Sequence, residues 1–401
     1  MLLGLVGKPS VGKSTFFKAS TLAEVPIASY PFTTIKANHG IAYVKVDCLE
    51  KEFNTKCNPS HGFCLNGNRF VPIEMMDVAG LVPGASEGKG LGNQFLDDLR
   101  QADSFIHIVD LSGKTNAEGK PLEKNQEYSV IDDVNFLENE LDTWYYNIFM
   151  KVWKSFARKI EMENKKFSEA VANQFSGLKI SEELVKEVLL NLNLPEKPTS
   201  WNEKQIKEFI KDLRHKSKPS IIAANKIDTE KGEQNYKILK EKFPDLLIIP
   251  CSADSELALR EAAKEDLIDY IPGEKEFKIT FKGQEKLNEK QKQALEKIKK
   301  NVLEKYEFGT GIQKVLNTAI FDLLKYLAVF PASANKLSDS KGNILPDCFL
   351  MPLGSTALDF AYKVHKDIGD KFIRAINAKT KQTVGKDYKL QHRDGLEIIS
   401  R

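Results

Sequence analysis

The chain has 401 residues and a formal net charge of +3, and 41% of its residues are apolar while 29% are charged. This composition is typical of a globular protein of two or three domains and argues against a disordered chain. Because no run of about 18 apolar residues occurs and the first residues lack the features of a signal peptide, we expect a cytoplasmic protein without a membrane partner. We also expect a monomer.

A phosphate-binding loop is predicted at the start of the chain. It lies between a short apolar strand, Leu2–Val6, and a helix over residues 15–21, and it consists of Gly7, Lys8, Pro9, Ser10, Val11, Gly12, Lys13 and Ser14, followed by Thr15. Glycines in such a loop let backbone N–H groups surround a polyphosphate, while Lys13 supplies a cation and the Ser14 hydroxyl binds Mg²⁺. The motif therefore predicts a nucleoside triphosphate site.

Five cysteines in a chain of this length favour reduced thiols over a disulfide framework. Three of them gather with a histidine in a segment rich in Gly, Asn and Pro, as Cys48, Cys57, His61 and Cys64. Thiolates and imidazole are the ligands that a structural Zn²⁺ prefers, although the first spacing is loose for a zinc motif. Two interpretations stay open here, a zinc site and ordinary loop thiols.

Further strand-like runs alternate with helical stretches, which predicts an α/β fold with a mostly parallel sheet. These runs cover residues 71–76, 105–109, 220–224 and 246–250. A helical, coiled-coil-like insertion is expected at about residues 120–218. Apolar residues at three- and four-residue steps from Val134 to Ile160 predict one long helix, and a second helix begins near Ser181, so the two would form a hairpin.

The pattern changes near residue 275. We expect a nucleotide domain over residues 1–275, a helical connector over 276–327, with a charged helix at about 284–306, and a small α+β domain over 328–401. Residues 275–401 contain 24 Lys and Arg against 15 Asp and Glu. This basic excess predicts an anionic partner, and the alternative is a solvated, lysine-rich helix face.

Two further motifs predict the metal site and the switch. Asp77, at the end of the second strand, would hold Mg²⁺ through water, and the Gly80 N–H would reach the terminal phosphate. Thr34, with Thr33 as the alternative, would complete Mg²⁺ coordination only while that phosphate is present. We assign catalysis to Lys13, Gly80 and Thr34. Leu81 cannot orient a water molecule, so slow intrinsic hydrolysis is expected.

The base is predicted from the sequence Asn225-Lys226-Ile227-Asp228 after the strand at 220–224. A carboxylate at Asp228 can accept two hydrogen bonds from the N1–H and N2–H₂ groups of guanine, whereas adenine offers no such pair. Ser252 and Ala253, after the next strand, would donate backbone N–H groups to the guanine O6. Together these motifs favour GTP over ATP.

Five longer stretches carry a resemblance to a known family: YPFTTI at residues 30–35, DVAGLVPGA at 77–85, GKGLGNQFL at 88–96, LGSTALDFAY at 353–362 and VHKDIG at 364–369. The first three resemble the YchF branch of the Obg-related GTPases, in its archaeal-type form. The last two resemble the TGS domain, a β-grasp module shared with threonyl-tRNA synthetases and stringent-response proteins. The resemblance covers about residues 1–275 and 325–401.

This resemblance implies a P-loop G domain that hydrolyses GTP to GDP with Mg²⁺ and acts as a switch on the ribosome or on structured RNA. The basic C-terminal region and the helical insertion would make those contacts. Ser10 stands where several potassium-stimulated relatives carry Asn, which argues against activation by K⁺. Two alternatives remain: an Obg-like ATPase, which many YchF proteins are, and an RNA-binding module in which the nucleotide is structural.

Overall fold

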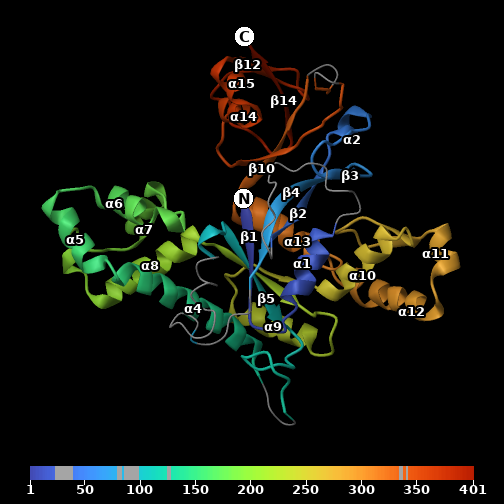
Figure 1. Ribbon diagram of the computed structural model, residues 1–401, viewed down its shortest axis with the longest axis horizontal. Helices are drawn as coiled ribbons and strands as arrows, with labels where there is room; N and C mark the ends of the chain where they lie inside the picture. The colour runs from blue at the N-terminus through green and yellow to red at the C-terminus, as the bar shows by residue number, and fades with distance from the viewer. Residues whose placement is uncertain (23–38, 79–83, 85–98, 124–127, 334–336, 340–341) are drawn as a thin grey trace. The chain divides into compact units, whose positions relative to one another are not determined.

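The computed structural model describes residues 1–22, 39–78, 84, 99–123, 128–333, 337–339 and 342–401 (Figure 1). The chain forms two compact units. The first comprises residues 1–17 and 75–254, and the second comprises residues 18–74 and 255–401. In the described part of the chain, no helix combines the length and the apolar character that a membrane crossing requires.

The first unit contains a parallel sheet. Its strands pair in the order β1 (Leu2–Val6), β5 (Ser104–Asp110), β6 (Ser220–Asn225) and β7 (Ile248–Pro250), with Leu3 opposite Ser104 and Ile106 opposite Ile221. Every residue of β1 and of β5 is buried, as expected for parallel strands covered on both faces. The α/β prediction with a mostly parallel sheet is confirmed.

Helices connect these strands. They are α1 (Lys13–Thr21), α9 (Gly232–Lys242) and α10 (Ala253–Lys264), which begin close after β1, β6 and β7 respectively. Each loop between a strand and its helix therefore lies at the carboxyl end of a parallel strand. In open α/β sheets this is the edge at which ligands bind.

The insertion between β5 and β6 contains more helices than the predicted hairpin. They are α4 (Val130–Met150), α5 (Trp153–Met162), α6 (Phe167–Gln174), α7 (Glu182–Asn191) and α8 (Glu203–Ser217), with short 3₁₀ turns at Ser176–Leu178 and Pro198–Ser200. The prediction of one long helix from Val134 to Ile160 is wrong, because that segment divides into α4 and α5. The Ser181 side chain caps α7 as expected, by accepting a hydrogen bond from the Leu184 N–H.

Aromatic packing explains why the helix divides. The ring of Trp153, the first residue of α5, lies with its centroid 5.5 Å from that of Trp201 and 6.3 Å from that of Phe209. Val152, between the helices, has φ −120° and ψ −13°, outside the helical region. The apolar spacing continues through this position, so the spacing alone could not reveal the turn.

The second unit contains strands β2 (His39–Asp47), β3 (Phe63–Leu65) and β4 (Asn68–Asp77), except for the last residues of β4, which belong to the first unit. β2 neighbours β4, and β3 pairs with β4 in antiparallel register, with Cys64 opposite Arg69. The short helix α2 (Glu50–Phe53) precedes β3. Strand β2 was not predicted, although its residues Ile41 and Tyr43, two positions apart, fit the alternation that is typical of a strand.

The middle of the second unit is mostly helical. A two-stranded antiparallel pair, β8 (Ile268–Tyr270) and β9 (Phe277–Ile279), comes first. The helices α11 (Phe281–Lys286), α12 (Glu289–Ile298) and α13 (Ile312–Asn317) follow, with π-helical turns at Lys299–Leu303 and Thr318–Leu323. The predicted helix at 284–306 is thus interrupted at Leu287 and Asn288, where Asn288 caps α12.

The C-terminal sheet has the strand order β11-β10-β14-β12-β13. Its strands are β10 (Tyr326–Pro331), β11 (Phe349–Pro352), β12 (Phe372–Asn377), β13 (Thr383–Val384) and β14 (Asp394–Ser400), and its helices are α14 (Ala357–Val364) and α15 (Lys366–Asp370). Thr356 forms a capping box with Asp359 at the start of α14. The prediction of a small α+β module at this end of the chain is confirmed.

Candidate nucleotide-binding site

The loop between β1 and α1 has the backbone that a phosphate site needs. Gly7 and Gly12 adopt φ values of 148° and 99°, and Ser10 adopts 66°, a left-handed conformation that side chains rarely take. A Cβ atom at Gly7 would lie 2.6 Å from the Ile108 carbonyl oxygen, so only glycine fits there. The backbone conformation of the loop therefore explains why the motif has glycine at these positions.

The Lys13 side chain folds back onto the phosphate loop. Its Nζ atom donates to the carbonyl oxygens of Gly7 and Lys8 at 3.1 and 2.8 Å. Burial lowers the pKa of Lys13 to about 8, an effect that the nearby Asp77 carboxylate partly opposes. A bound phosphate would place negative charge next to the Lys13 ammonium group and would favour its charged form. Lys13 is therefore positioned to bind an anion.

Ser14 and Asp77 meet as the motif analysis expects for a magnesium site. The Ser14 hydroxyl donates to Asp77 Oδ2 at 2.9 Å. Burial raises the pKa of Asp77, while the Ser14 hydrogen bond and the Lys13 charge lower it. Hydroxyl and carboxylate oxygens are ligands that suit Mg²⁺, so the residues present fit this ion.

The Asn225 side chain connects two other parts of the site. Its Nδ2 atom donates to the Val11 carbonyl in the phosphate loop at 2.9 Å, and its Oδ1 atom accepts the Ala253 N–H at 3.0 Å. The side chain is buried. Asn225 thus braces the phosphate loop against the Cys251-Ser252-Ala253 segment, which the sequence analysis assigned to base recognition.

Lys226 braces the same loop from a second position. Its Nζ atom donates to the Ser10 carbonyl at 3.0 Å and forms an ion pair with the buried carboxylate of Asp110 at 2.8 Å. Asp110, the last residue of β5, was not among the predicted site residues. Its position at the carboxyl end of a buried strand is the signal that could have found it.

The carboxylate of Asp228 is exposed, and it forms no hydrogen bond to a residue within the described ranges. Asp228 acts electrostatically on Cys251, whose pKa is raised mainly by burial and further by this charge. A free carboxylate beside the 251–253 segment is what base recognition by Asp228 requires. Ser252 and Ala253 are both buried at the end of β7.

Lys8 has a structural role that the motif does not reveal. Its ammonium group lies 3.0 Å from Asp133 Oδ1 in α4, donates to the Thr115 carbonyl at 2.9 Å and lies 4.0 Å from the centroid of the Tyr128 ring. These contacts attach the phosphate loop to the start of the insertion. Neither Asp133 nor Tyr128 was singled out from the sequence.

Several predicted residues lie outside the part of the chain that the structure describes. They are Thr33 and Thr34 of the predicted switch, Gly80 and Leu81. The remaining predicted nucleotide residues all belong to the first unit. His107 is buried in β5, and burial lowers its pKa to about 4, so it is neutral near pH 7.

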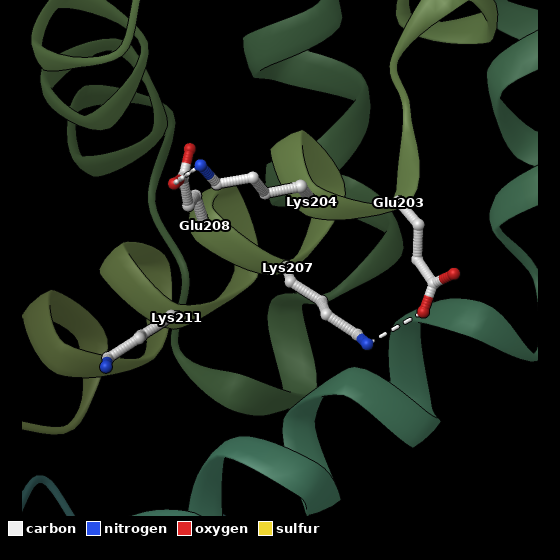
Figure 2. A pocket seen from close by; sticks show the side chains of 5 residues that line it. All are labelled: Glu203, Lys204, Lys207, Glu208 and Lys211. Carbon is white, nitrogen blue, oxygen red and sulfur yellow. Dashed lines mark ion pairs between the residues drawn. The ribbon is translucent and has the colours of Figure 1, made fainter.

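Away from the loop, the insertion carries a hollow on the outer face of α8. Figure 2 shows its lining of five charged side chains, Glu203, Lys204, Lys207, Glu208 and Lys211. Lys207 and Glu203 are 2.7 Å apart, and Lys204 and Glu208 are 4.0 Å apart. Such pairs, spaced four residues apart, are typical of a solvated helix face, and we assign no ligand to this hollow.

The predicted zinc ligands are only partly brought together. The thiols of Cys48, Cys57 and Cys64 gather with the carboxylate of Glu50. His61 is not part of that group, and its Nδ1 atom lies 2.7 Å from the Asp347 carboxylate instead. Glu50 therefore takes the place that the sequence analysis gave to His61.

The groups described above lie where β1, β4, β6 and β7 end, at the ligand-binding edge of a parallel α/β sheet. A phosphate loop there, with Asp77 beside Ser14 and Asn225 beside the loop, makes this protein a P-loop GTPase, which belongs to the nucleoside triphosphate hydrolases. The model "50S ribosome-binding GTPase" matches residues 2–140, the "Obg-like GTPase YGR210-like, G4 motif-containing domain" matches 223–333, and the TGS domain matches 341–400.

Relatives match along the whole chain. An uncharacterized GTP-binding protein of Methanocaldococcus jannaschii is 49% identical over 400 residues, covering 100% of this chain and 99% of the relative. The ribosome-binding ATPase YchF of Buchnera aphidicola subsp. Acyrthosiphon pisum is 27% identical over 419 residues, covering 99% and 98%. The crystal structure of a GTP-binding protein from Pyrococcus horikoshii OT3 superposes with a TM-score of 0.79 at 39% identity, with 100% of both chains covered. The chain belongs to the YchF family of Obg-related GTP-binding proteins.

Proposed function

We propose that the protein binds GTP together with Mg²⁺, hydrolyses it slowly to GDP, and uses the nucleotide state to control binding to the ribosome or to structured RNA. The observation that carries this proposal is the double bracing by Asn225, which donates to Val11 at 2.9 Å and accepts from Ala253 at 3.0 Å. One side chain thus links the phosphate loop to the segment predicted to contact the base.

Guanine specificity depends on Asp228. Its carboxylate is exposed next to the braced motif, and an ionised carboxylate can accept the two parallel hydrogen bonds that guanine donates. The backbone N–H of Ser252 would donate to the guanine O6; the Ala253 N–H, predicted to do the same, donates to Asn225 Oδ1 in this structure and would have to exchange that bond for O6. The alternative is ATP, and the description of the Buchnera relative as an ATPase favours testing it directly.

The metal and the catalytic groups follow from the phosphate loop. Ser14 and Thr34 would bind Mg²⁺, with Asp77 acting through water, and Lys13 and the Gly80 N–H would hold the terminal phosphate. When bound, Mg²⁺ would neutralise charge on the transferred phosphoryl group. Leu81 offers no group to orient water, which supports a slow intrinsic rate. Ser10 supports hydrolysis that is independent of K⁺.

The partner is proposed from charge and from family. Residues 275–401 carry a net positive charge, a TGS domain matches residues 341–400, and the Buchnera relative is described as ribosome-binding. We propose that the C-terminal region and the helical insertion make these contacts, and that the protein is a cytoplasmic monomer. The three-part division at residues 275 and 327 remains our proposal; the TGS match over 341–400 lies within the third part, while the match over 223–333 runs across both boundaries.

A competition experiment tests the base assignment. Unlabelled GTP and ATP compete with a fluorescent guanine nucleotide on the nucleotide-free protein, and the same assay is run on Asp228→Asn. We expect GTP to bind better, and the variant to lose about 10- to 100-fold of that preference, because a hydrogen bond to a charged group contributes about 1.5–3 kcal/mol. Glu230→Gln, which removes another exposed acidic group two residues away, should change nothing. Equal affinity of the wild-type protein for GTP and ATP would favour the ATPase alternative.

Ribosome binding is tested by co-sedimentation with GDP, with GTP and with a non-hydrolysable GTP analogue, each over a salt series. The switch predicts that the amount bound depends on the nucleotide. Binding that is the same in all nucleotide states, and in a Lys13→Ala protein, would instead support an RNA-binding module with a structural nucleotide.

A further inference from the structure

Four metal-ligating side chains of the second unit converge at one place. Cys48 directly follows β2, Glu50 begins α2, Cys57 lies in the loop after α2, and Cys64 lies in β3. One ligand atom from each, three sulfurs and a carboxylate oxygen, lies within 4.8 Å of all the others. These atoms come from four separate places in the local structure, so their convergence is not a consequence of sequence proximity alone.

The spacing suits a single tetrahedral ion. With Zn–S bonds of about 2.3 Å, a tetrahedral angle places two sulfurs about 3.8 Å apart. The 4.8 Å limit of the group is near that value, so small side-chain movements would complete the coordination. An iron–sulfur cluster holds its thiolates farther apart, because the cluster itself lies between them. The geometry therefore favours one Zn²⁺ with four protein ligands, which is the arrangement of a structural site.

Hydrogen bonds already orient the ligands toward each other. Glu50 Oε2 accepts the Cys57 N–H at 2.8 Å, and its Oε1 atom lies 3.4 Å from the Cys64 sulfur. The Cys48 N–H donates to the Gly67 carbonyl at 2.9 Å, which attaches this residue to the turn between β3 and β4. A carboxylate that receives a backbone hydrogen bond from a neighbouring ligand is the kind of outer contact that orients metal ligands.

A buried cation stands beside the group. Arg69 is fully buried, it lies opposite Cys64 in the β3–β4 pair, and its charge acts on the thiols of both Cys48 and Cys348. Its Nη2 atom donates to the Leu345 carbonyl, while Nε and Nη1 have no hydrogen-bond partner among the described residues. Three thiolates and one carboxylate around Zn²⁺ carry two net negative charges, and a buried guanidinium would offset one of them.

We propose that Cys48, Cys57, Cys64 and Glu50 bind one Zn²⁺, with a structural role. The ion would fasten the segment between β2 and β4, which has only the four-residue helix α2 and the three-residue strand β3 as regular structure. Binding would release protons from the thiols, as it does wherever cysteine ligates zinc. This site is independent of the nucleotide proposal, because none of its ligands belongs to the unit that holds the phosphate loop.

The test is the metal content of the full chain, purified under reducing conditions without a chelator and measured by mass spectrometry of the elements. We expect one zinc per chain. Replacement by Co²⁺ should give the intense thiolate-to-metal absorption and the visible bands of a tetrahedral site. Less than a tenth of an equivalent of zinc, after growth and purification with zinc present, would overturn the proposal.

Variants distinguish the ligand set. Glu50→Gln and Cys57→Ser should each weaken zinc binding at least as much as loss of an outer contact does, about 10- to 100-fold, whereas His61→Ala should keep one zinc per chain. Cys348→Ser is the matched thiol control outside the group and should also keep the metal. Loss of zinc in His61→Ala or Cys348→Ser, or a zinc affinity in Glu50→Gln equal to that of the unmodified chain, would contradict this ligand set.

A measurement on the unmodified chain covers the case in which a variant does not fold. Alkylation of the native protein, read by peptide mass spectrometry, should leave Cys57 and Cys64 protected until a chelator is added. Alkylation without a chelator would contradict a bound ion, as would a disulfide between any two of these cysteines in protein kept under reducing conditions.

Discussion

The ammonium group of Lys8 lies 3.0 Å from the carboxylate of Asp133, and both side chains are at most 3% exposed. One residue belongs to the phosphate loop and the other to α4, the first helix of the insertion. Burial raises the pKa of Asp133, and the Lys8 charge opposes that effect. The pair therefore connects the nucleotide loop to the insertion through two charges that depend on each other.

Asp133→Ala should reduce the free energy of unfolding of the nucleotide-free protein by about 3–5 kcal/mol, since it leaves the buried Lys8 charge uncompensated. Urea denaturation followed by circular dichroism measures this. The double variant Lys8→Met, Asp133→Leu should recover most of the loss, because it removes both charges. Asp132→Ala, at the exposed neighbouring position, is the control and should change stability by less than about 0.5 kcal/mol.

Asn225→Ala should weaken both the fold and nucleotide binding. It removes a donor from Val11 and an acceptor from Ala253, at a cost of about 1–3 kcal/mol for each buried group left unpaired. Asn235→Ala removes a comparable side-chain hydrogen bond, to the Leu111 carbonyl at 2.8 Å, outside the proposed site. Thermal unfolding should detect both losses, while GTP titration should detect only the first. Equal GTP affinities in the two variants would contradict the bracing role.

When the nucleotide binds above about pH 8, the protein should take up a proton from the buffer. Burial lowers the pKa of Lys13 to about 8, and a bound phosphate would raise it, so affinity should be full below pH 8 and fall as the pH rises through 8. Calorimetry in two buffers of different ionisation enthalpy measures the uptake. Lys13→Arg should abolish it, because arginine stays charged. Lys218, whose pKa burial also lowers to about 8, contacts the carbonyls of Arg100 and Ala102 instead, so Lys218→Arg should leave the uptake unchanged.

Magnesium dependence should weaken as the pH falls. The pKa of Asp77 is raised, chiefly by burial, so this carboxylate becomes protonated at a higher pH than an ordinary Asp and then no longer attracts Mg²⁺. As the pH falls, the Mg²⁺ concentration that gives half-maximal hydrolysis should begin to increase at a higher pH than an ordinary Asp would produce. Asp77→Asn should need more Mg²⁺ at every pH and should lose this pH dependence. A wild-type requirement that stays constant as the pH falls to about 4, the pKa of an ordinary Asp, would contradict the assignment of Asp77.

The elements that could be predicted were those whose signal is local. The strand Leu2–Val6, the loop from Gly7 to Ser14 and the start of α7 after Ser181 were all placed correctly, because a short apolar run, glycine spacing and an N-cap each depend on neighbouring residues. The missed turn between α4 and α5 lies in an unbroken apolar spacing, and packing of Trp153 against Trp201 from a distant part of the chain produces it.

The residues of the candidate site likewise divide into those that the sequence predicts and those that only the folded structure brings together. The sequence by itself determined the phosphate loop, Asp77 and the Asn225 motif, because backbone freedom, charge and hydrogen-bonding capacity belong to the residues that carry them. Only the tertiary structure decided that Lys226 pairs with Asp110, that Lys8 pairs with Asp133, and that Glu50 rather than His61 joins the cysteines. Those partners are separated along the chain or placed by a turn, and an ion pair or a metal site exists only where folding brings its atoms within a few ångströms.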